Sequence, residues 1–304
     1  MGTAFGRPTG QKLSVAQVLP FRAEHIIPFH IVAAGGCWLE LTGREPVWLG
    51  EGDAVLLPHG ESHGLRGREA ATPVQVGQLL PRPPWTDILV VAHGGGERQA
   101  CSVVCGFLQC DELLFHPILR HLPALLHVRA EARDRWLAAT IRHAAAEATA
   151  LLPGSRDMLP RLTELMFVEI LREHMQELAD DEVGWFAAYR DPVAGAALGC
   201  LHAAPFEDWS VATLARRVGV SRSVLAERFK RLLDQPPMHY LAGWRLQLAA
   251  QQMKTSELPM KTIADRAGYE SEAAFSRAFK RRFGLPPGEW RRRQGSHPAT
   301  RIAS

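Results

Sequence analysis

The chain has 304 residues, of which 46% are hydrophobic and 22% are charged. This length and composition suit about two globular domains with buried cores and exclude a chain that is disordered throughout. The net charge of +3 combines a basic C-terminal part, residues 201–304 with 18 Lys and Arg against 9 Asp and Glu, with an acidic remainder that has 17 against 23. A polyanionic partner is therefore expected for the C-terminal third alone.

Cysteine usage and the first residues indicate the compartment. The five cysteines are odd in number and follow no zinc-finger spacing. The chain does not begin with a charged segment followed by an apolar one, and no apolar run approaches the roughly 18 residues that cross a bilayer. We therefore expect a soluble protein in a reducing cytoplasm, with no membrane partner.

Residues 1–111 are expected to form a β-sandwich or a small barrel. Short apolar segments alternate there with clusters of Gly, Pro and Asp, which is typical of strands joined by tight turns. The expected strands are Phe29–Ala33, Cys37–Leu41, Val47–Leu49, Ala54–Leu57, Val74–Leu80, Ile88–Val91 and Val103–Leu108.

From residue 112 the apolar period becomes helical. One stripe includes Trp136, Leu137 and Ile141, Pro153-Gly154 interrupts it, and a second stripe begins at Leu162. Residues 112–199 are therefore expected to be a helical linker and dimerisation region, which either covers the barrel or forms a subunit interface. Residues 294–304 are polar and are expected to be a disordered tail.

One pattern occurs twice between residues 209 and 290. At an offset of 49, Leu214, Ala215, Arg217 and Gly219 match Ile263, Ala264, Arg266 and Gly268. At an offset of 50, Leu225, Phe229, Lys230, Arg231, Pro236 and Pro237 match Phe275, Phe279, Lys280, Arg281, Pro286 and Pro287. Each copy predicts a helix that ends at glycine, a turn, and a second helix capped by Ser221 or Ser271 with one apolar and one basic face. This is the plan of a helix-turn-helix unit.

A connecting helix is expected over Tyr240–Met253, where apolar residues repeat at helical spacing. It would hold the two second helices at a fixed separation, as successive major-groove faces about 34 Å apart require. A helical bundle with solvated Lys and Arg is the alternative for a single copy, but the duplication favours DNA binding.

Residues 209–292 resemble the DNA-binding domain of AraC/XylS-type regulators, most specifically in the stretch IADRAGYESEAAFSRAFKRRFGLPPGEWR. The resemblance implies an all-α tandem helix-turn-helix domain over residues 200–293 that binds double-stranded DNA, with RNA polymerase as the partner of an activator. By position, the base-facing residues would be Arg222, Ser223, Ala226, Glu227, Glu272, Ala273, Ser276 and Arg277. The phosphate contacts would be Lys230, Arg245, Lys280 and Arg281. Arg277 is suited to reading guanine, and Glu227 to accepting from cytosine.

The stretch from Gly52 to His63 resembles the second cupin motif, a glycine and then Pro-x-Gly-x-x-His. It implies a cupin-like sensor barrel, as in AraC-type regulators that place an effector domain before the DNA-binding domain. In metal cupins His63 would be a ligand, but the upstream His-x-His is missing, because the corresponding stretch reads FRAEH. We therefore expect no metal and no other cofactor. His63 is expected to be a satisfied structural histidine near the barrel mouth, and His30 and His63 are also candidates for an effector or redox site.

Three cysteines are candidates for a redox response. Cys101 and Cys105 are expected on one strand and one face, about 13 Å apart, which is beyond disulfide reach. Buried apolar cysteine is the simpler interpretation of all three. Cys37, however, lies on another strand and can approach either of them across the barrel, which would make a redox switch.

A weaker pattern suggests a hydrolase. Gly60 to Gly64 fits G-x-S-x-G and His93 to Gly96 resembles an oxyanion loop, but residues 65–73 have no helical period and the loop should precede the serine. We therefore expect no enzyme activity. The expected fold class is α+β multidomain, and the expected protein is a homodimeric, sequence-specific regulator that responds to a small molecule or an oxidant. The alternatives are a cupin metalloenzyme fused to a DNA-binding module, and a constitutive DNA binder whose barrel only dimerises.

Overall fold

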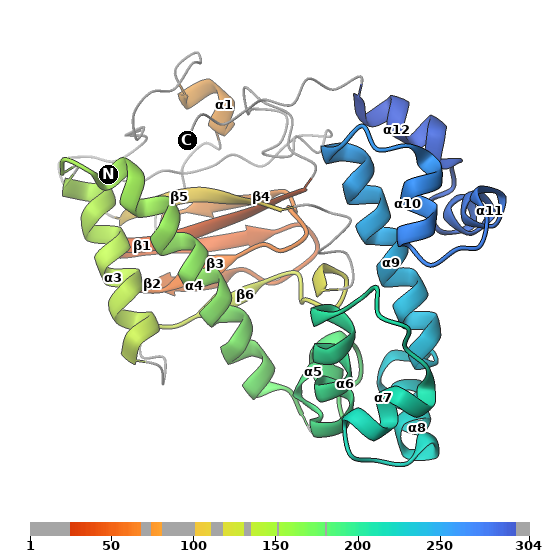
Figure 1. Cartoon of the computed structure of the whole chain (residues 1–304). Helices are drawn as coiled ribbons and strands as arrows, with labels where there is room; N and C mark the ends of the chain where they lie inside the picture. The colour runs from red at the N-terminus through yellow and green to blue at the C-terminus, as the bar shows by residue number, and fades with distance from the viewer. Residues whose placement is uncertain are drawn as a thin grey trace. The chain divides into compact units, whose positions relative to one another are not determined.

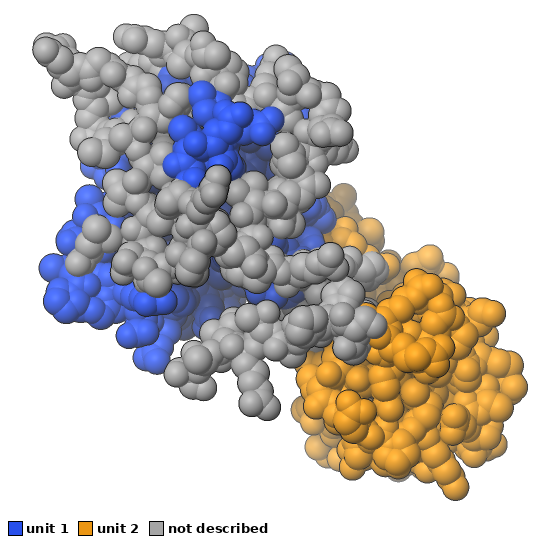
Figure 2. Space-filling view, turned by 90° about the horizontal axis from the view of Figure 1, so that it is seen from above, with its two compact units in different colours: residues 1–111, 122–177 blue, residues 112–121, 178–304 orange. Residues whose placement is uncertain are grey.

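The computed structural model describes residues 25–67, 74–80, 101–110, 118–130, 135–150, 152–179 and 181–295. The chain divides into two compact units (Figure 1, Figure 2). The sheet unit comprises residues 1–111 and 122–177, and the helical unit comprises residues 112–121 and 178–304. All described strands belong to the sheet unit, so the predicted α+β multidomain class is confirmed. No helix in the described ranges is long and apolar enough to cross a membrane.

One long strand organises the sheet unit. The strands are β1 (His25–Leu41), β2 (Val47–Gly50), β3 (Ala54–Leu56), β4 (His63–Arg66), β5 (Cys101–Cys110) and β6 (Leu126–Val128). The first part of β1 pairs with β3 and β5 and its last part with β2 and β4, all antiparallel, while β6 pairs with β3. A register shift between Val32 and Ala34 marks a bulge in β1, which bends the strand between these two sets of partners. At Gly36 a Cβ would lie 2.4 Å from the Trp48 ring, so only glycine fits there.

The two faces of the sheet have different neighbours. Side chains alternate along β1, so Phe29 and Ile31 face the helix α4 (Ser155–Glu177), whereas His30 and Val32 point to the opposite, inner face. Helices α3 (Arg135–Ala150) and α4 lie across the outer face (Figure 1). The inner face holds the buried cluster Val32, Cys37, Leu39, Leu49, Val55, Leu65 and Cys101.

The strand predictions are confirmed at most described positions. Phe29–Ala33 and Cys37–Leu41 are two parts of β1, which continues through the glycines between them. The strand predicted at Val74–Leu80 is wrong, because Val76–Leu79 form the single helical turn α1. This turn buries no side chain, so the segment has no apolar face that packing in a sheet would bury. Ile88–Val91 lies outside the described residues. Short β4 was not predicted, and β6 lies in a region predicted to be helical.

The two predicted helices and the break between them are confirmed by α3 and α4, but Trp136 of the first predicted stripe and Leu165 and Val168 of the second are exposed. Leu137 and Ile141 are fully buried, and Gly154 takes the left-handed φ of 91° between the helices. Both helices belong to the same compact unit as the sheet. The predicted domain boundary after residue 199 differs from the structure, because α6 (Pro192–Ala203) runs through it and packs in the core of the helical unit. That unit resumes at residue 178.

The helical unit has two hydrophobic cores joined by one helix. Its remaining helices are α5 (Trp185–Arg190), α7 (Val211–Arg217), α8 (Arg222–Leu233), α9 (Pro237–Thr255), α10 (Met260–Arg266), α11 (Glu272–Phe283) and α12 (Pro287–Gly295). The first core combines α5 to α8 with the start of α9, and the second combines the rest of α9 with α10 to α12. Helix α9 confirms the predicted connecting helix (Figure 1). The first residues of the predicted tail belong to α12, and residues 296–304 lie outside the description.

Candidate functional site

The first copy of the repeat folds as a helix, a tight turn and a second helix. Helix α7 ends before Gly219, whose φ of 73° is favourable for glycine because it has no Cβ. The Ser221 hydroxyl then accepts a hydrogen bond from the Val224 amide at 3.2 Å and caps α8. Leu225 and Phe229 are fully buried. Burial of this stripe fixes which face of α8 points outward.

The second copy repeats each of these features. Gly268 has a φ of 82°, and the Ser271 hydroxyl accepts from the Ala274 amide at 3.2 Å at the start of α11. Phe275 and Phe279 are fully buried and pack against each other with ring centroids 5.5 Å apart. The two predicted helix-turn-helix units are therefore confirmed, with their second helices at α8 and α11.

The residues predicted to face bases lie on the outer faces of α8 and α11. Those with exposed side chains are Arg222, Ser223, Ala226, Glu227, Glu272, Ala273 and Arg277, and only Ser276 is half-buried. Within the described residues, Arg277 and Glu227 form no ion pair, so their polar groups are available to a ligand. The eight residues predicted to face bases therefore lie on the exposed faces of two helices, four on α8 and four on α11.

The basic side chains of α8 and α11 differ in their partners. Lys280 and Arg281 are exposed on α11 and form no ion pair within the described part of the chain. Lys230 on α8 instead donates to Asp234, and this hydrogen bond lowers the pKa of that carboxyl group. The two helices therefore offer unequal positive charge to a polyanion.

Two further arginines of the basic face of α8 have structural roles. Arg228 and Arg231 lie 3.2 and 3.7 Å from one carboxylate oxygen of Asp191. The other oxygen of Asp191 accepts from the amides of Val193 and Ala194 and caps α6. Asp191 thus joins α8 to α6. The sequence pattern did not reveal this contact, because the partners are far apart along the chain.

Arg245, a predicted phosphate contact, already has backbone partners. Its Nε donates to the Pro205 carbonyl at 2.6 Å, and one terminal nitrogen donates to the Glu207 carbonyl at 2.7 Å. Burial lowers the pKa of this guanidinium group. Two of its three nitrogens are thus directed at backbone carbonyls, and its role as a phosphate contact stays a prediction.

In the sheet unit, two of the candidate cysteines meet on the inner face. Cys37 on β1 and Cys101 on β5 are each 3% exposed and belong to one buried cluster. Interaction with Cys101, and then burial, raise the pKa of Cys37, whereas interaction with Cys37 lowers the pKa of Cys101. Neither cysteine is part of a disulfide.

The third cysteine ends a hydrogen-bonded chain of three side chains. Cys105 pairs with His30 across β5 and β1, and its sulfur lies 3.0 Å from Nδ1 of His30. Nε2 of His30 lies 2.7 Å from Nε2 of His63, and Nδ1 of His63 lies 2.8 Å from the Glu61 carbonyl. We call this set the histidine chain.

In the neutral form of the histidine chain, the Glu61 carbonyl determines which atom of each side chain carries the proton. The Glu61 oxygen only accepts, so Nδ1 of His63 carries a proton and Nε2 of His63 accepts from Nε2 of His30. Nδ1 of His30 then accepts from the Cys105 thiol.

The pKa shifts agree with this neutral arrangement. Burial, and then the charge of His63, keep the pKa of His30 well below its ordinary value, and burial lowers the pKa of His63. Cys105 retains accessible surface, but protein atoms crowd its sulfur and desolvation raises its pKa to about 12. All three groups are therefore uncharged at neutral pH.

The histidine chain does not fit the metal centre of metal cupins. Its two Nε2 atoms are 2.7 Å apart and bonded to each other. A zinc ion at about 2.0–2.1 Å from each nitrogen would need a wider separation at tetrahedral angles. In the described ranges, no group of three or more His, Cys, Asp and Glu side chains is arranged to hold a metal.

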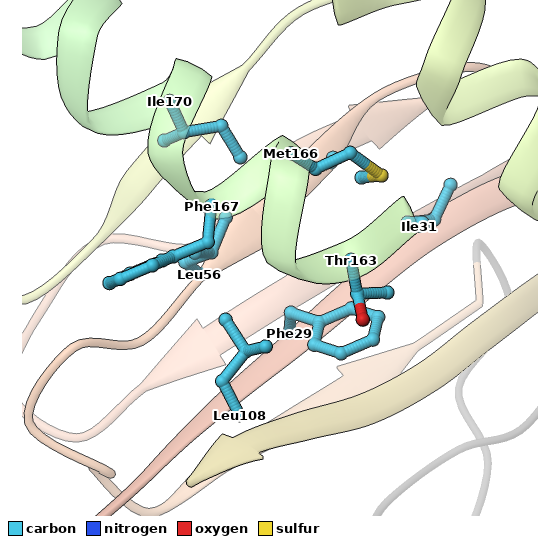
Figure 3. A pocket seen from close by; sticks show the side chains of 9 residues that line it. Phe29, Ile31, Leu56, Leu108, Thr163, Met166, Phe167 and Ile170 are labelled. Carbon is cyan, nitrogen blue, oxygen red and sulfur yellow. The ribbon is translucent and has the colours of Figure 1, made fainter. Parts of the chain in front are cut away.

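An apolar cavity lies on the other face of the sheet, below α4 (Figure 3). Its lining residues are Phe29, Ile31, Ala54, Leu56, Leu108, Thr163, Met166, Phe167 and Ile170. Its volume is about 10 Å³, room for about one water molecule and far below the about 300 Å³ at which sites for drug-sized ligands begin. It is therefore a gap in packing between α4 and the sheet, and the polar candidates lie on the opposite face.

Comparison with known proteins assigns both units. Residues 8–176 match the family model described as Cupin, and residues 214–293 match the one described as Helix-turn-helix domain. An AraC-like transcription regulator of Streptomyces lividans is 36% identical over 280 residues, which are 90% of this chain and 88% of that protein. The chain belongs to the AraC-type transcription regulators. The regulator AlkR of Acinetobacter baylyi is 29% identical over 88% of this chain and 89% of its own.

This AraC-type regulator thus combines a cupin-type ligand-binding domain with a DNA-binding pair of helix-turn-helix units. Its relatives are transcription regulators, which implies a role other than catalysis. The hydrolase pattern has no structural support either, because β4, a strand, follows Ser62 where a nucleophile elbow would open a helix. His93 to Gly96 lie outside the described residues.

Proposed function

We propose that α8 and α11 are the two helices through which this regulator reads DNA. The support is that the repeat exposes the same outer positions in both copies, while the opposite stripe of each helix is buried. Arg277 would bind guanine, Glu227 would accept from cytosine, and Lys280 and Arg281 would contact phosphates. RNA polymerase is the proposed partner and the cytoplasm the proposed compartment, on the family resemblance and the reduced thiols.

A fragment tests this assignment. Residues 178–304 contain both helix-turn-helix units and both cores of the helical unit. We expect this fragment to bind duplexes that the full-length protein selects from a randomised pool, with a salt dependence typical of phosphate contacts. A fragment that is folded by circular dichroism but shows no preference for selected over random duplexes would contradict the proposal.

We further propose that the cupin-type domain responds to an oxidant through Cys37 and Cys101. The observation that carries this is that two buried thiols on different, paired strands share one cluster of the inner face. A hydroperoxide would take two electrons from the pair, so two S–H bonds are replaced by one S–S bond and the products are one alcohol and one water. Only a small oxidant reaches thiols that are 3% exposed.

Peptide mapping and DNA binding test the oxidation proposal together. After treatment with hydrogen peroxide, we expect a disulfide-linked peptide pair containing Cys37 and Cys101 and an altered affinity for the selected duplex. Cys37→Ser should remove both effects, while Cys200→Ser, which changes a cysteine of the helical unit, should keep them. Free thiols throughout, or an affinity unchanged by the disulfide, would contradict the proposal and favour a constitutive binder.

The outer helices support a homodimer. Helices α3 and α4 expose large apolar side chains at Trp136, Met158, Leu165 and Val168, although both helices also pack on the sheet. We propose that this surface joins two copies of the chain, because exposed large apolar side chains on adjacent helices are typical of a subunit interface. Analytical ultracentrifugation of Leu165→Glu and wild-type protein checks this, since the substitution should shift the protein toward monomer. If Leu165→Glu remains dimeric like the wild type, the subunit interface lies on another surface.

A further inference from the structure

Helix α9 joins the two hydrophobic cores of the helical unit, and one of its side chains contacts both the loop that leads into the first helix-turn-helix unit and the turn of the second. We propose that Arg245 is a positioning residue that fixes the orientation of one helix-turn-helix unit relative to the other. The inference rests on the proposed function of α8 and α11 as a pair that binds one duplex. It assigns Arg245 to the geometry of binding, without contact to DNA.

On one side, Arg245 holds the loop that leads into the first unit. Its two hydrogen bonds, at 2.6 and 2.7 Å, reach the carbonyls of Pro205 and Glu207, 40 and 38 residues earlier in the chain. The same loop is anchored by Trp209, whose indole nitrogen donates to the Ala204 carbonyl at 2.8 Å. Helix α7 begins directly after this loop.

On the other side, Arg245 lies against the turn of the second unit. A Cβ added at Gly268 would be 2.8 Å from a terminal nitrogen of Arg245, so the guanidinium group rests on this turn. The next residue, Tyr269, packs edge-on against Phe275 with ring centroids 5.5 Å apart. Phe275 is fully buried in α11. Arg245 is therefore linked to α11 through the Gly268 turn and the contact between Tyr269 and Phe275.

The residue type suits this task. Arginine presents several donors in a rigid planar fork, so one side chain can bind two carbonyls and still lie flat on a glycine turn. Lysine has a single ammonium group on a flexible stem and does not reproduce that geometry. Among the described residues, the two cores are connected through α9, which contributes side chains to both. The contacts of Arg245 add a second connection. Without Arg245, small rotations about α9 would change the separation of α8 and α11.

The test is the dependence of affinity on the spacing of the two half-sites. The full-length protein is measured on its selected duplex and on duplexes with one or two base pairs inserted between the half-sites. An inserted pair moves the second half-site by about 3.4 Å and rotates it around the helix axis. We expect wild-type affinity to fall steeply with each insertion, and Arg245→Ala to bind the original duplex about tenfold more weakly but to lose less on insertion.

Two further variants make the result specific. Arg291→Ala is the matched control, because Arg291 also donates to a backbone carbonyl, that of Leu258 at 2.8 Å, but both partners lie in the part of the chain around the second core. It should keep the steep spacing profile. Arg245→Lys keeps the charge and is expected to flatten the spacing profile as Arg245→Ala does. It replaces Arg245→Ala as the test if circular dichroism shows that the alanine variant is unfolded.

The salt dependence separates this role from a phosphate contact. A positioning role predicts that Arg245→Ala leaves the slope of affinity against salt unchanged, whereas loss of a phosphate contact would reduce the slope by about one. A reduced slope, or a spacing profile as steep as that of the wild type, would overturn the inference while leaving the proposed function intact. If the wild-type protein selects no duplex at all, the proposed function itself fails.

Discussion

The helical unit and the sheet unit carry their functional side chains in opposite ways. In the helical unit, Arg277 and Lys280 point outward and form no ion pair within the described residues. In the sheet unit, Cys37, Cys101 and His30 point inward; the two cysteines share one buried cluster, and His30 is hydrogen-bonded to Cys105. An outward side chain can contact a macromolecular ligand without supporting the fold, whereas an inward side chain also stabilises the fold around it. Substitutions should separate these two roles.

Arg277→Ala should produce the largest change in DNA binding without a change in stability. The loss of one bidentate base contact costs about 1–3 kcal/mol of discrimination, so affinity should fall by roughly ten- to a hundredfold at one base position. The free energy of unfolding should be unchanged, because the side chain has no partner in the described part of the protein. Binding to a panel of single-base variants of the selected duplex, with urea unfolding alongside, measures both. An equal loss on every duplex would show that Arg277 does not read a base.

Lys280→Ala should weaken binding to all duplexes alike and reduce the salt slope by about 0.9. Lys230→Ala is its counterpart in the first unit and should have a smaller effect, because Lys230 is already paired with Asp234. Asp234→Asn removes that competitor and should therefore strengthen binding slightly. Salt titrations of the three variants provide the comparison, and equal slopes for both lysine variants would contradict the proposed difference between α8 and α11.

The inward side chains predict a pH dependence of stability. The folded-state pKa values of His30 and His63 lie below the ordinary 6.5, so the unfolded chain binds more protons and the free energy of unfolding falls as the pH drops below about 6.5. Each ring that stays neutral contributes a slope of at most about 1.4 kcal/mol per pH unit. Cys105, which faces His30, remains protonated throughout this range.

Urea unfolding at pH 7.5 and 5.5 checks this dependence. His63→Gln should make the loss of stability on acidification smaller, since it removes one titrating ring of the histidine chain. His202→Gln is the control for the helical unit, because burial lowers the pKa of His202 as well. A loss that is unchanged by His63→Gln but abolished by His202→Gln would assign the whole effect to the helical unit.

The sequence predicted the helical unit more completely than the sheet unit for a physical reason. Helix-turn-helix geometry depends on local signals, namely glycine at a left-handed φ, serine at the cap, and apolar residues at helical spacing, and all of them can be read in the repeat. The position of Arg245 depends on carbonyls about 40 residues away, which no local pattern encodes. The family resemblance, carried over by position, had suggested a phosphate contact instead.

In the sheet unit, contacts between strands determine the site. The sequence identified Cys37, Cys101, Cys105, His30 and His63 as candidates. It did not predict which thiols meet, because that depends on the bulge in β1 and on its register with β5. The Glu61 carbonyl, which orders the protons of the histidine chain, is a backbone group and leaves no signal in the sequence.

Two helix-turn-helix units that bind one face of a single duplex should leave a distinctive footprint, which hydroxyl-radical cleavage reveals. The full-length protein on its selected duplex should protect two patches with centres about 10–10.5 base pairs apart. Arg277→Ala should weaken the patch bound by α11 more than the other. A single protected patch, or two patches that Arg277→Ala weakens equally, would contradict the account.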